Sequence, residues 1–128
     1  MTTEPIDLVR EFCAAFGAGG PDLDLDRIVG FFADDAVYHN IPVDPVVGPD
    51  AIRATLAGFT AGVEQVEFRI VSIAADGGTV LTERVDVFRL PGKDISLPVM
   101  GTFEVVDGKI AAWRDYFDMN QFMSQLAG

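Results

Sequence analysis

The amino-acid sequence predicts an α+β domain, with N-terminal helices packed in a strongly curved, mostly antiparallel mixed sheet that forms a cone. Before residue 62, apolar residues recur at helical spacing in three segments. After residue 62 the apolar pattern changes to period two, as in strands. Helices on one face of such a sheet would leave a hollow apolar pocket. At 128 residues, the chain has the length of one domain spanning residues 1–128.

The N-terminal half is expected to hold three helices and one short strand. The first helix covers residues 4–18 with Thr2 or Thr3 as its cap, and a short second helix follows Asp22 or Asp24 and runs to Phe32. Residues 36–41 form a strand, and the prolines of residues 42–49 mark a loop. The third helix covers residues 49–61, because its apolar residues fall on one side.

Four strands are expected after residue 62. They cover residues 63–75, 79–90, 94–106 and 109–117. The segments between them, Asp76-Gly77-Gly78, Pro91-Gly92-Lys93 and Asp107-Gly108, contain the residues typical of tight turns. Residues 118–126 form a last helical turn or two, with Asp118 as the cap.

Composition narrows the choice of partners and compartment. Hydrophobic residues make up 49% of the chain and the mean hydropathy is +0.28, which fits a lined apolar pocket or a buried oligomer interface. The net charge of −11 disfavours nucleic acid and anionic membrane surfaces as partners. The N-terminus has no signal-peptide pattern, and no apolar run reaches the roughly 20 residues that span a bilayer. We therefore expect a cytoplasmic protein.

No residue pattern predicts a metal or an organic cofactor. The single histidine, His39, argues against a His-rich metal site, and the motifs GxGxxG, HExxH and GxSxG are absent from the sequence. The acids Asp22, Asp24 and Asp26 alternate as in some calcium loops, but the glycine and distal glutamate of an EF-hand are missing. Helix capping explains these acids better.

Three charged residues stand where the strand pattern calls for apolar ones. Arg84 and Asp86 share a strand face with Phe88, and Asp115 shares a face with Trp113 and Phe117. A buried carboxylate must be paired or protonated. Two carboxyl groups and one arginine in an apolar cavity would let one carboxyl ionise while the other keeps its proton, which is the arrangement for paired acid–base chemistry.

Each candidate also has a structural explanation. Arg84 and Asp86 could be an exposed pair, because the opposite face of their strand is equally mixed. Tyr38 and Asn40 share a face and could hold a water molecule together, or could satisfy a loop. His39 points the other way and is interpreted as a surface or structural residue.

Three segments together resemble the limonene-1,2-epoxide hydrolase family. They are Tyr38-His39-Asn40-Ile41-Pro42, Thr82-Glu83-Arg84-Val85-Asp86-Val87 and Trp113-Arg114-Asp115-Tyr116-Phe117-Asp118. The family belongs to the wider group of cone-shaped domains that resemble nuclear transport factor 2, ketosteroid isomerase and SnoaL. The similarity runs from the second helix to about Phe122.

The resemblance implies a one-step epoxide hydrolysis by a homodimer, without metal or cofactor. By position, Asp115 matches the base that deprotonates water, and Tyr38 and Asn40 match the groups that hold this water. Asp86 matches the acid that protonates the epoxide oxygen, and Arg84 lies between the two carboxyl groups.

The substrate implied is a lipophilic cyclic or terpene-like epoxide, which gives a vicinal diol. Phe88, Leu97, Val99, Phe117 and Phe122 match pocket-lining positions of the family, and we add Leu56, Phe59 and Met100 as expected lining residues. His39, Ile41 and Phe88 depart from the family pattern, and the large Phe88 can reshape the pocket.

Two other classes of function stay open. A ketosteroid-isomerase-like enzyme would use the same residue types, but its tyrosine belongs in the first helix, which has none here. A polyketide-cyclase-like catalyst would need a histidine partner in the pocket. A domain of this shape can also bind a small molecule without catalysis.

Overall fold

The computed structural model describes residues 4–17 and 23–128, which form four helices and six strands. The first half contains α1 (Pro5–Ala14), α2 (Leu25–Val29), β1 (Phe32–Asn40), β2 (Val46–Val47) and α3 (Pro49–Thr60). The second half contains β3 (Gln65–Asp76), β4 (Thr79–Leu90), β5 (Lys93–Val106), β6 (Lys109–Tyr116) and α4 (Met119–Ala127). The predicted α+β class with its mixed, curved sheet is confirmed.

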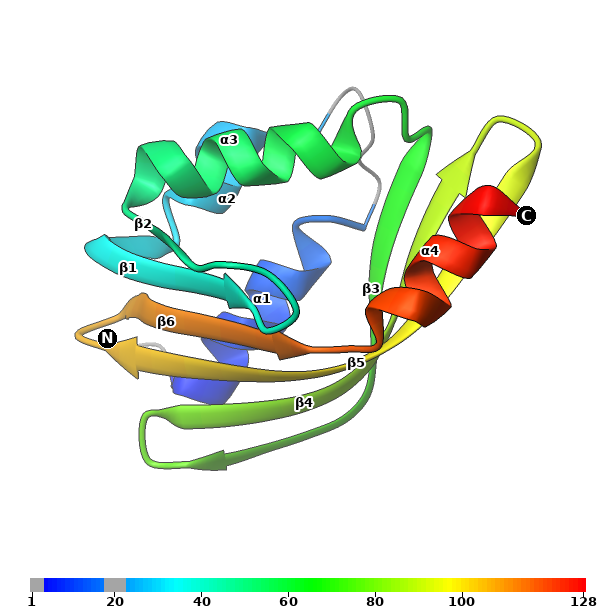
Figure 1. Cartoon of the computed structure of the whole chain (residues 1–128). Helices are drawn as coiled ribbons and strands as arrows, with labels where there is room; N and C mark the ends of the chain where they lie inside the picture. The colour runs from blue at the N-terminus through cyan, green and yellow to red at the C-terminus, as the bar shows by residue number, and fades with distance from the viewer. Residues whose placement is uncertain (1–3, 18–22) are drawn as a thin grey trace.

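The six strands form one sheet in the order β2-β1-β6-β5-β4-β3. All neighbouring strands are antiparallel except β1 and β6, which are parallel. In Figure 1 the strands curve around α1, while α2 and α3 lie above it and α4 lies beside the far end of β5. The sheet does not close, and its concave side faces the helices.

Turn chemistry explains why the four long strands were predicted within a few residues of their ends. Gly77, Gly92 and Gly108 all have positive φ, which glycine adopts without steric cost. Asp107 also has a positive φ of 51°, so Asp107 and Gly108 form the two-residue turn that an Asp-Gly pair favours between antiparallel strands.

The first strand was predicted too short and one strand was missed. β1 begins at Phe32, not at residue 36, and Phe32 therefore belongs to the sheet and not to the second helix. Its pairing with β6 shifts between Phe32 and Val37, which breaks the alternation by which strands are recognised. The two-residue β2 carries no periodicity, and its residues were predicted as loop.

The first and last helices have boundaries that differ from the predicted ones. α1 ends at Ala14, and the side chain of its N-cap residue Glu4 makes no capping hydrogen bond. The predicted caps Thr2, Thr3 and Asp22 lie outside the described residues. Asp24 caps α2, because its carboxylate accepts a hydrogen bond of 3.0 Å from the Arg27 N–H. Asp118 caps α4 as predicted, by accepting from the N–H groups of Asn120 and Gln121.

An aromatic core lies between α1 and the sheet. Phe12 makes edge-to-face contacts with five other aromatic side chains, which are Phe16, Phe31, Phe32, Phe103 and Trp113. Cys13 is buried here, and burial raises the pKa of its thiol to about 12. Because Trp113 lies on β6 two residues before Asp115, this core fixes the strand that carries the carboxylate. Within the described residues, no helix is long and apolar enough to cross a membrane.

Candidate active site

Sheet register brings the polar residues of four strands into one row. Asn40 of β1 lies beside Asp115 of β6, Asp115 lies beside Gly101 of β5, and Gly101 lies beside Thr82 of β4. Arg84 follows Thr82 on the same face of β4. The residues that the sequence placed in three separate segments therefore meet on the concave face of the sheet.

The Arg84 guanidinium joins the two carboxyl groups. Its Nε donates to Asp86 Oδ1 at 3.0 Å and its Nη2 donates to Asp86 Oδ2 at 2.9 Å. On the other side, Nη1 donates to Asp115 Oδ1 at 3.1 Å and Nη2 donates to Asp115 Oδ2 at 2.8 Å. Arg84 is only 1% exposed, so this is a fully buried carboxyl–guanidinium–carboxyl cluster and not the exposed pair that the sequence left open.

Two residues that sequence reasoning missed hold this cluster. The Thr82 hydroxyl accepts a hydrogen bond from Arg84 Nη1 at 3.2 Å and donates one to the Gly101 carbonyl at 3.2 Å. A Cβ on Gly101 would lie within 3.0 Å of Arg84 Nη1, Asp115 Oδ1 and Thr82 Oγ1. Arg84 therefore reaches Asp115 across β5 only because residue 101 has no side chain. An isolated glycine within a strand pattern is the signal that could have found it.

The two carboxyl groups differ in how well their ionised forms are stabilised. Asp115 accepts three hydrogen bonds, two from Arg84 and one of 2.7 Å from Trp113 Nε1. Asp86 accepts two, both from Arg84. Hydrogen bonds from donors favour the charged form of a carboxyl, so Asp115 is the better place for the negative charge and Asp86 for the proton.

Burial is the largest influence on the pKa of Asp86. Burial and the nearby Asp115 raise this pKa, Arg84 lowers it, and the net value is about 6. Burial also disfavours the charge on Arg84, but the two carboxylates more than offset it, so the pKa of Arg84 lies well above its ordinary value. Arg84 is thus permanently charged, and the proton that can be exchanged belongs to the carboxyl groups.

Tyr38 and Asn40 lie next to Asp115. The Tyr38 ring stacks on Trp113 with 4.1 Å between the ring centroids. Burial, and then the charge of Asp115, raise the pKa of the Tyr38 hydroxyl, which therefore stays protonated and can donate a hydrogen bond. Tyr38 and Asn40 line the same cavity as Asp86 and Asp115, whereas His39 is not among its lining residues.

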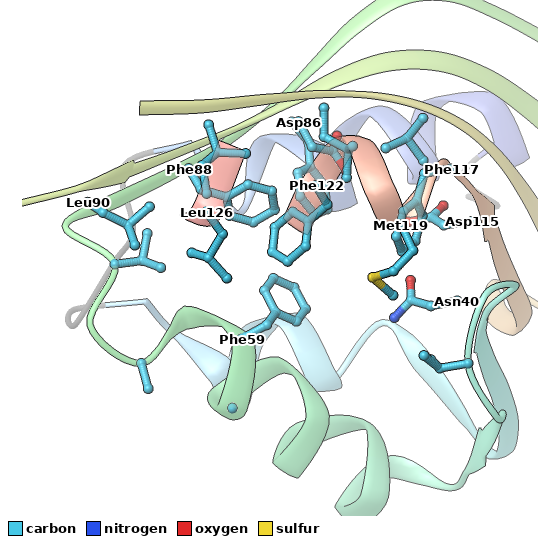
Figure 2. A pocket seen from close by; sticks show the side chains of 18 of the residues that line it. Asn40, Phe59, Asp86, Phe88, Leu90, Asp115, Phe117, Met119, Phe122 and Leu126 are labelled. Carbon is cyan, nitrogen blue, oxygen red and sulfur yellow. The ribbon is translucent and has the colours of Figure 1, made fainter. Parts of the chain in front are cut away.

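The cavity has a volume of about 410 Å³ and two chemically different ends. Asn40 and Asp115 lie toward one end and Phe88 and Leu90 toward the other, with Asp86 and the rings of Phe59 and Phe122 between them (Figure 2). Phe88 contacts both of these rings edge to face, at centroid distances of 5.9 and 6.1 Å. A small ligand bound here would have one polar end at the carboxyl groups and an otherwise apolar surrounding.

The structure places six of the eight expected lining residues at the cavity: Phe59, Phe88, Leu97, Val99, Phe117 and Phe122. The other two are corrected. Leu56 lies on α3 and is fully buried in the hydrophobic core. Met100 is 53% exposed, because strand alternation turns it to the opposite face from Leu97 and Val99. The cavity also has lining residues that were not predicted from the sequence, on helices, strands and loops around it: Val43, Gly58, Ala61, Val63, Phe68, Leu90, Ile95, Met119 and Leu126.

Phe68 is the most informative of these additional residues. The Arg84 guanidinium carbon lies 4.9 Å from the centroid of its ring, so Phe68 covers the cation as well as lining the cavity. Among the described residues, no group of three or more His, Cys, Asp or Glu side chains is arranged to hold a metal ion.

Comparisons with known proteins agree with this site. The family model of the limonene-1,2-epoxide hydrolase catalytic domain matches residues 3–128. Epoxide hydrolase EphG of Mycobacterium tuberculosis is 39% identical over 106 residues, which are 82% of this chain and 70% of that protein. The structure of an LEH-like epoxide hydrolase from M. tuberculosis superposes with a TM-score of 0.82 at 35% identity, covering 99% of this chain and 92% of that one. The chain belongs to the limonene-1,2-epoxide hydrolase family, and as a member it is an epoxide hydrolase.

More distant structures share the fold alone. A protein described as a SnoaL-like polyketide cyclase from Shewanella putrefaciens superposes with a TM-score of 0.84 at 18% identity, over 99% of this chain and 98% of that one. The expected cone-shaped fold is therefore confirmed.

We predict that Gly101→Ala displaces the Arg84 cluster while the fold persists. The added methyl group must push Arg84 or Asp115 aside, which costs about 1–3 kcal/mol of stability and, by misplacing the carboxyl groups, about 100-fold in kcat/KM. Thr102→Ala, the neighbouring position on the outward face of β5, is the control and should change neither value. Near-normal activity of Gly101→Ala with epoxides would contradict the close approach described above.

We predict that Asp86 makes the protein more stable in acid. Its folded-state pKa of about 6 lies above the ordinary value of 3.8, so the folded state retains the proton over a wider pH range than the unfolded chain. This stabilising contribution is complete below pH 3.8 and is lost as the pH rises through about 6. Between these two limits the free energy of unfolding falls by about 3 kcal/mol.

Urea unfolding between pH 3.5 and 7.5 measures this contribution by comparing the unaltered protein with Asp86→Asn. The free energy of unfolding of Asp86→Asn should lack the decrease between about pH 4 and 6, because asparagine does not titrate. Parallel curves for the two proteins would show that Asp86 does not hold a proton in the folded state.

Proposed function

We propose that this enzyme adds water to a lipophilic cyclic or terpene-like epoxide in a single step, without a cofactor, to give a vicinal diol. One observation carries the proposal. A single guanidinium holds two carboxyl groups, one suited to the proton and the other to the charge, at the polar end of an apolar cavity. This is the pairing that hydrolysis of an epoxide requires, because water must be deprotonated while the leaving oxygen is protonated.

Asp115 is proposed as the general base. Water is a weak nucleophile, so a carboxylate must remove one of its protons as its oxygen attacks an epoxide carbon. Tyr38 and Asn40 line the cavity beside Asp115 and supply a hydroxyl and an amide that can orient this water. Trp113 and Arg84 hold the Asp115 carboxylate in place during the transfer.

Asp86 is proposed as the general acid. The carbon–oxygen bond of the epoxide breaks as Asp86 delivers its proton to the epoxide oxygen, which becomes the second hydroxyl of the diol. The pKa of about 6 makes this proton available near and below that pH. After one turnover Asp115 carries a proton and Asp86 is ionised, so the net charge of the cluster is unchanged. To restore the starting state, Asp115 must release its proton to solvent and Asp86 must take one up from solvent.

The cavity supports the proposed substrate class. Its lining is mainly aliphatic and aromatic, with the polar groups gathered at the carboxyl end. A ring or terpene skeleton can fill the aromatic end between Phe59, Phe88 and Phe122 while its epoxide lies against the carboxyl groups.

The alternatives make different demands on the site. An isomerase or cyclase on the same fold would convert an enone or close a ring without forming a diol, and a binding module would hold its ligand unchanged. His39, the histidine that a cyclase-like mechanism would use, does not line the cavity. Diol formation from an epoxide therefore separates the proposal from all three alternatives.

We predict that Asp86→Asn and Asp115→Asn each reduce diol formation from limonene-1,2-epoxide and cyclohexene oxide by at least about 1,000-fold, because each removes one half of the acid–base pair. For the unaltered enzyme, kcat/KM should fall as the pH rises through about 6, since Asp86 then loses its proton. Glu11→Gln, which changes an exposed acid on α1, serves as the control.

A single turnover in oxygen-18 water tests the one-step route. Labelled diol from the first turnover means that water attacks directly. An unlabelled first turnover would mean that a protein carboxylate supplies the oxygen through a covalent intermediate, and would overturn the roles assigned to Asp86 and Asp115.

We also propose that two copies of the chain associate through the outer face of the sheet. This face carries exposed apolar side chains from four neighbouring strands, Val71, Leu81, Met100 and Tyr116, with Glu83 and Arg114 among them. A patch of apolar residues with charges of both signs can pair with its own copy about a twofold axis.

Met100→Glu tests this association, because it places a charge in the centre of the patch. We predict that the unaltered protein sediments as a dimer at micromolar concentration and that Met100→Glu sediments as a monomer. Met123→Glu, which changes an equally exposed methionine on α4, is the matched control and should remain a dimer. A monomeric unaltered protein would end this proposal and leave the catalytic one intact.

A further inference from the structure

The side-chain amide of Gln125 binds the backbone of β5. Its Oε1 accepts a hydrogen bond of 2.9 Å from the Ser96 N–H, and its Nε2 donates one of 2.8 Å to the Ser96 carbonyl. Nε2 also donates to the Gln121 carbonyl of its own helix at 3.2 Å. Both polar atoms of the amide are therefore engaged, and they tie α4 to a single residue of the sheet.

This contact lies where β5 has β4 on one side but no neighbouring strand on the other. The pairing of β6 with β5 begins at Met100, so residues 93–99 of β5 present an unpaired edge on that side. An antiparallel neighbour would exchange an N–H···O and an O···H–N bond with one residue at this edge. The Gln125 amide forms this same pair of bonds, and so substitutes for a strand.

α4 forms a wall of the cavity, although the helix has no fully buried residue. Met119, Phe122 and Leu126 line the cavity at helical spacing. Figure 2 shows Phe122 and Leu126 facing Phe59 and Phe88 across the apolar end. A second polar contact lies at the end of the helix, where Lys93 Nζ donates to the carbonyls of Leu126 and Gly128.

We propose that Gln125 is a positioning residue that sets the size of epoxide this enzyme accepts, an inference that rests on the proposed function. Its two bonds to Ser96 hold α4 against β5, and thereby hold Phe122 and Leu126 at the apolar end of the cavity. Without them α4 can move outward. The apolar end then widens, while the Arg84 cluster on the sheet stays in place.

The consequence is a change in selectivity and not a uniform loss of activity. A small epoxide such as cyclohexene oxide loses contact with the wall when α4 moves, so its KM rises. A bulkier epoxide, such as limonene-1,2-epoxide, gains room. Since no reacting group lies on α4, kcat for the small substrate and the pH dependence of kcat/KM stay the same.

Gln125→Met is the test variant, because methionine keeps the length and the helix propensity of the side chain but removes both bonds to Ser96. Gln121→Met, one turn earlier on the same helix and exposed, is the matched control. Hydrogen exchange monitored by mass spectrometry should show faster exchange over residues 119–127 in Gln125→Met only.

Steady-state kinetics with the two epoxides give the second measurement. In Gln125→Met the KM for cyclohexene oxide should rise roughly three- to tenfold with kcat within about twofold, as expected for the loss of one or two ordinary hydrogen bonds. The ratio of kcat/KM for limonene-1,2-epoxide to that for cyclohexene oxide should rise by at least the same factor. The control should match the unaltered enzyme in both respects.

Three outcomes would overturn the proposal. Unchanged exchange over residues 119–127 would mean that Gln125 does not hold α4. Faster exchange with an unchanged selectivity ratio would mean that α4 does not set substrate size. An equal fall in kcat for both epoxides, or a shifted pH dependence, would mean that the variant disturbs the catalytic cluster.

Failure of the proposed function gives a different result. If the unaltered protein hydrolyses neither epoxide, binding of cyclohexene and of limonene, which lack the epoxide, replaces the kinetics. Trp113 is the only tryptophan of the chain and borders the site, so its emission reports occupancy. Weaker cyclohexene binding relative to limonene, together with faster α4 exchange in Gln125→Met, would support the role of Gln125 in holding this wall of the cavity. An unchanged ratio of the two affinities would overturn it.

Discussion

The rest of the site depends on how the charge of one buried arginine is satisfied. A guanidinium has five N–H donors. Those of Arg84 all have acceptors, which are two oxygens of Asp86, two of Asp115 and the Thr82 hydroxyl. An arginine removed from water without such partners would cost several kcal/mol, and loss of one partner of a buried pair typically costs about 3–5 kcal/mol. The registers of β4 and β6 are therefore constrained together, because a slip of one residue in either strand would turn one of these groups to the opposite face.

The local pattern of the sequence was enough to predict the strands that carry this cluster, but not which strands lie side by side in the sheet. Period two placed Arg84 with Asp86, and Asp115 with Trp113, because alternation is a property of a single strand. The parallel contact of β1 with β6, which brings Asn40 beside Asp115, joins segments more than 70 residues apart and leaves no trace in local periodicity. The same limit explains Met100 and Leu56. Both are apolar in amphipathic segments, and only the assembled sheet decides which face lines a cavity and which lies in the core or outside.

Catalytic geometry and pocket shape rest on parts of the fold that differ in stiffness. The carboxyl groups are held by a continuous sheet and by the aromatic core around Phe12 and Trp113, where every displacement disturbs close packing. One wall of the cavity instead rests on a helix without fully buried residues, held by polar contacts at Gln125 and Lys93. Local stability follows the number of buried contacts, so α4 is the element most easily displaced without disturbing the cluster. This separation allows the shape of the cavity to change while the two carboxyl groups stay in place.

The cluster also explains how two adjacent carboxyl groups can take opposite roles. With Arg84 charged and one proton shared between Asp86 and Asp115, the three groups are neutral as a whole, which is the least costly state in an apolar surrounding. Both ionised would leave a net negative charge, and both protonated a net positive one. Trp113 breaks the symmetry, since its indole N–H donates to Asp115 and not to Asp86. These contacts favour the proton on Asp86 before a reaction, and in the proposed mechanism a proton taken by Asp115 is balanced by the one that Asp86 gives up. The proposed acid and base are thus coupled through one positive charge.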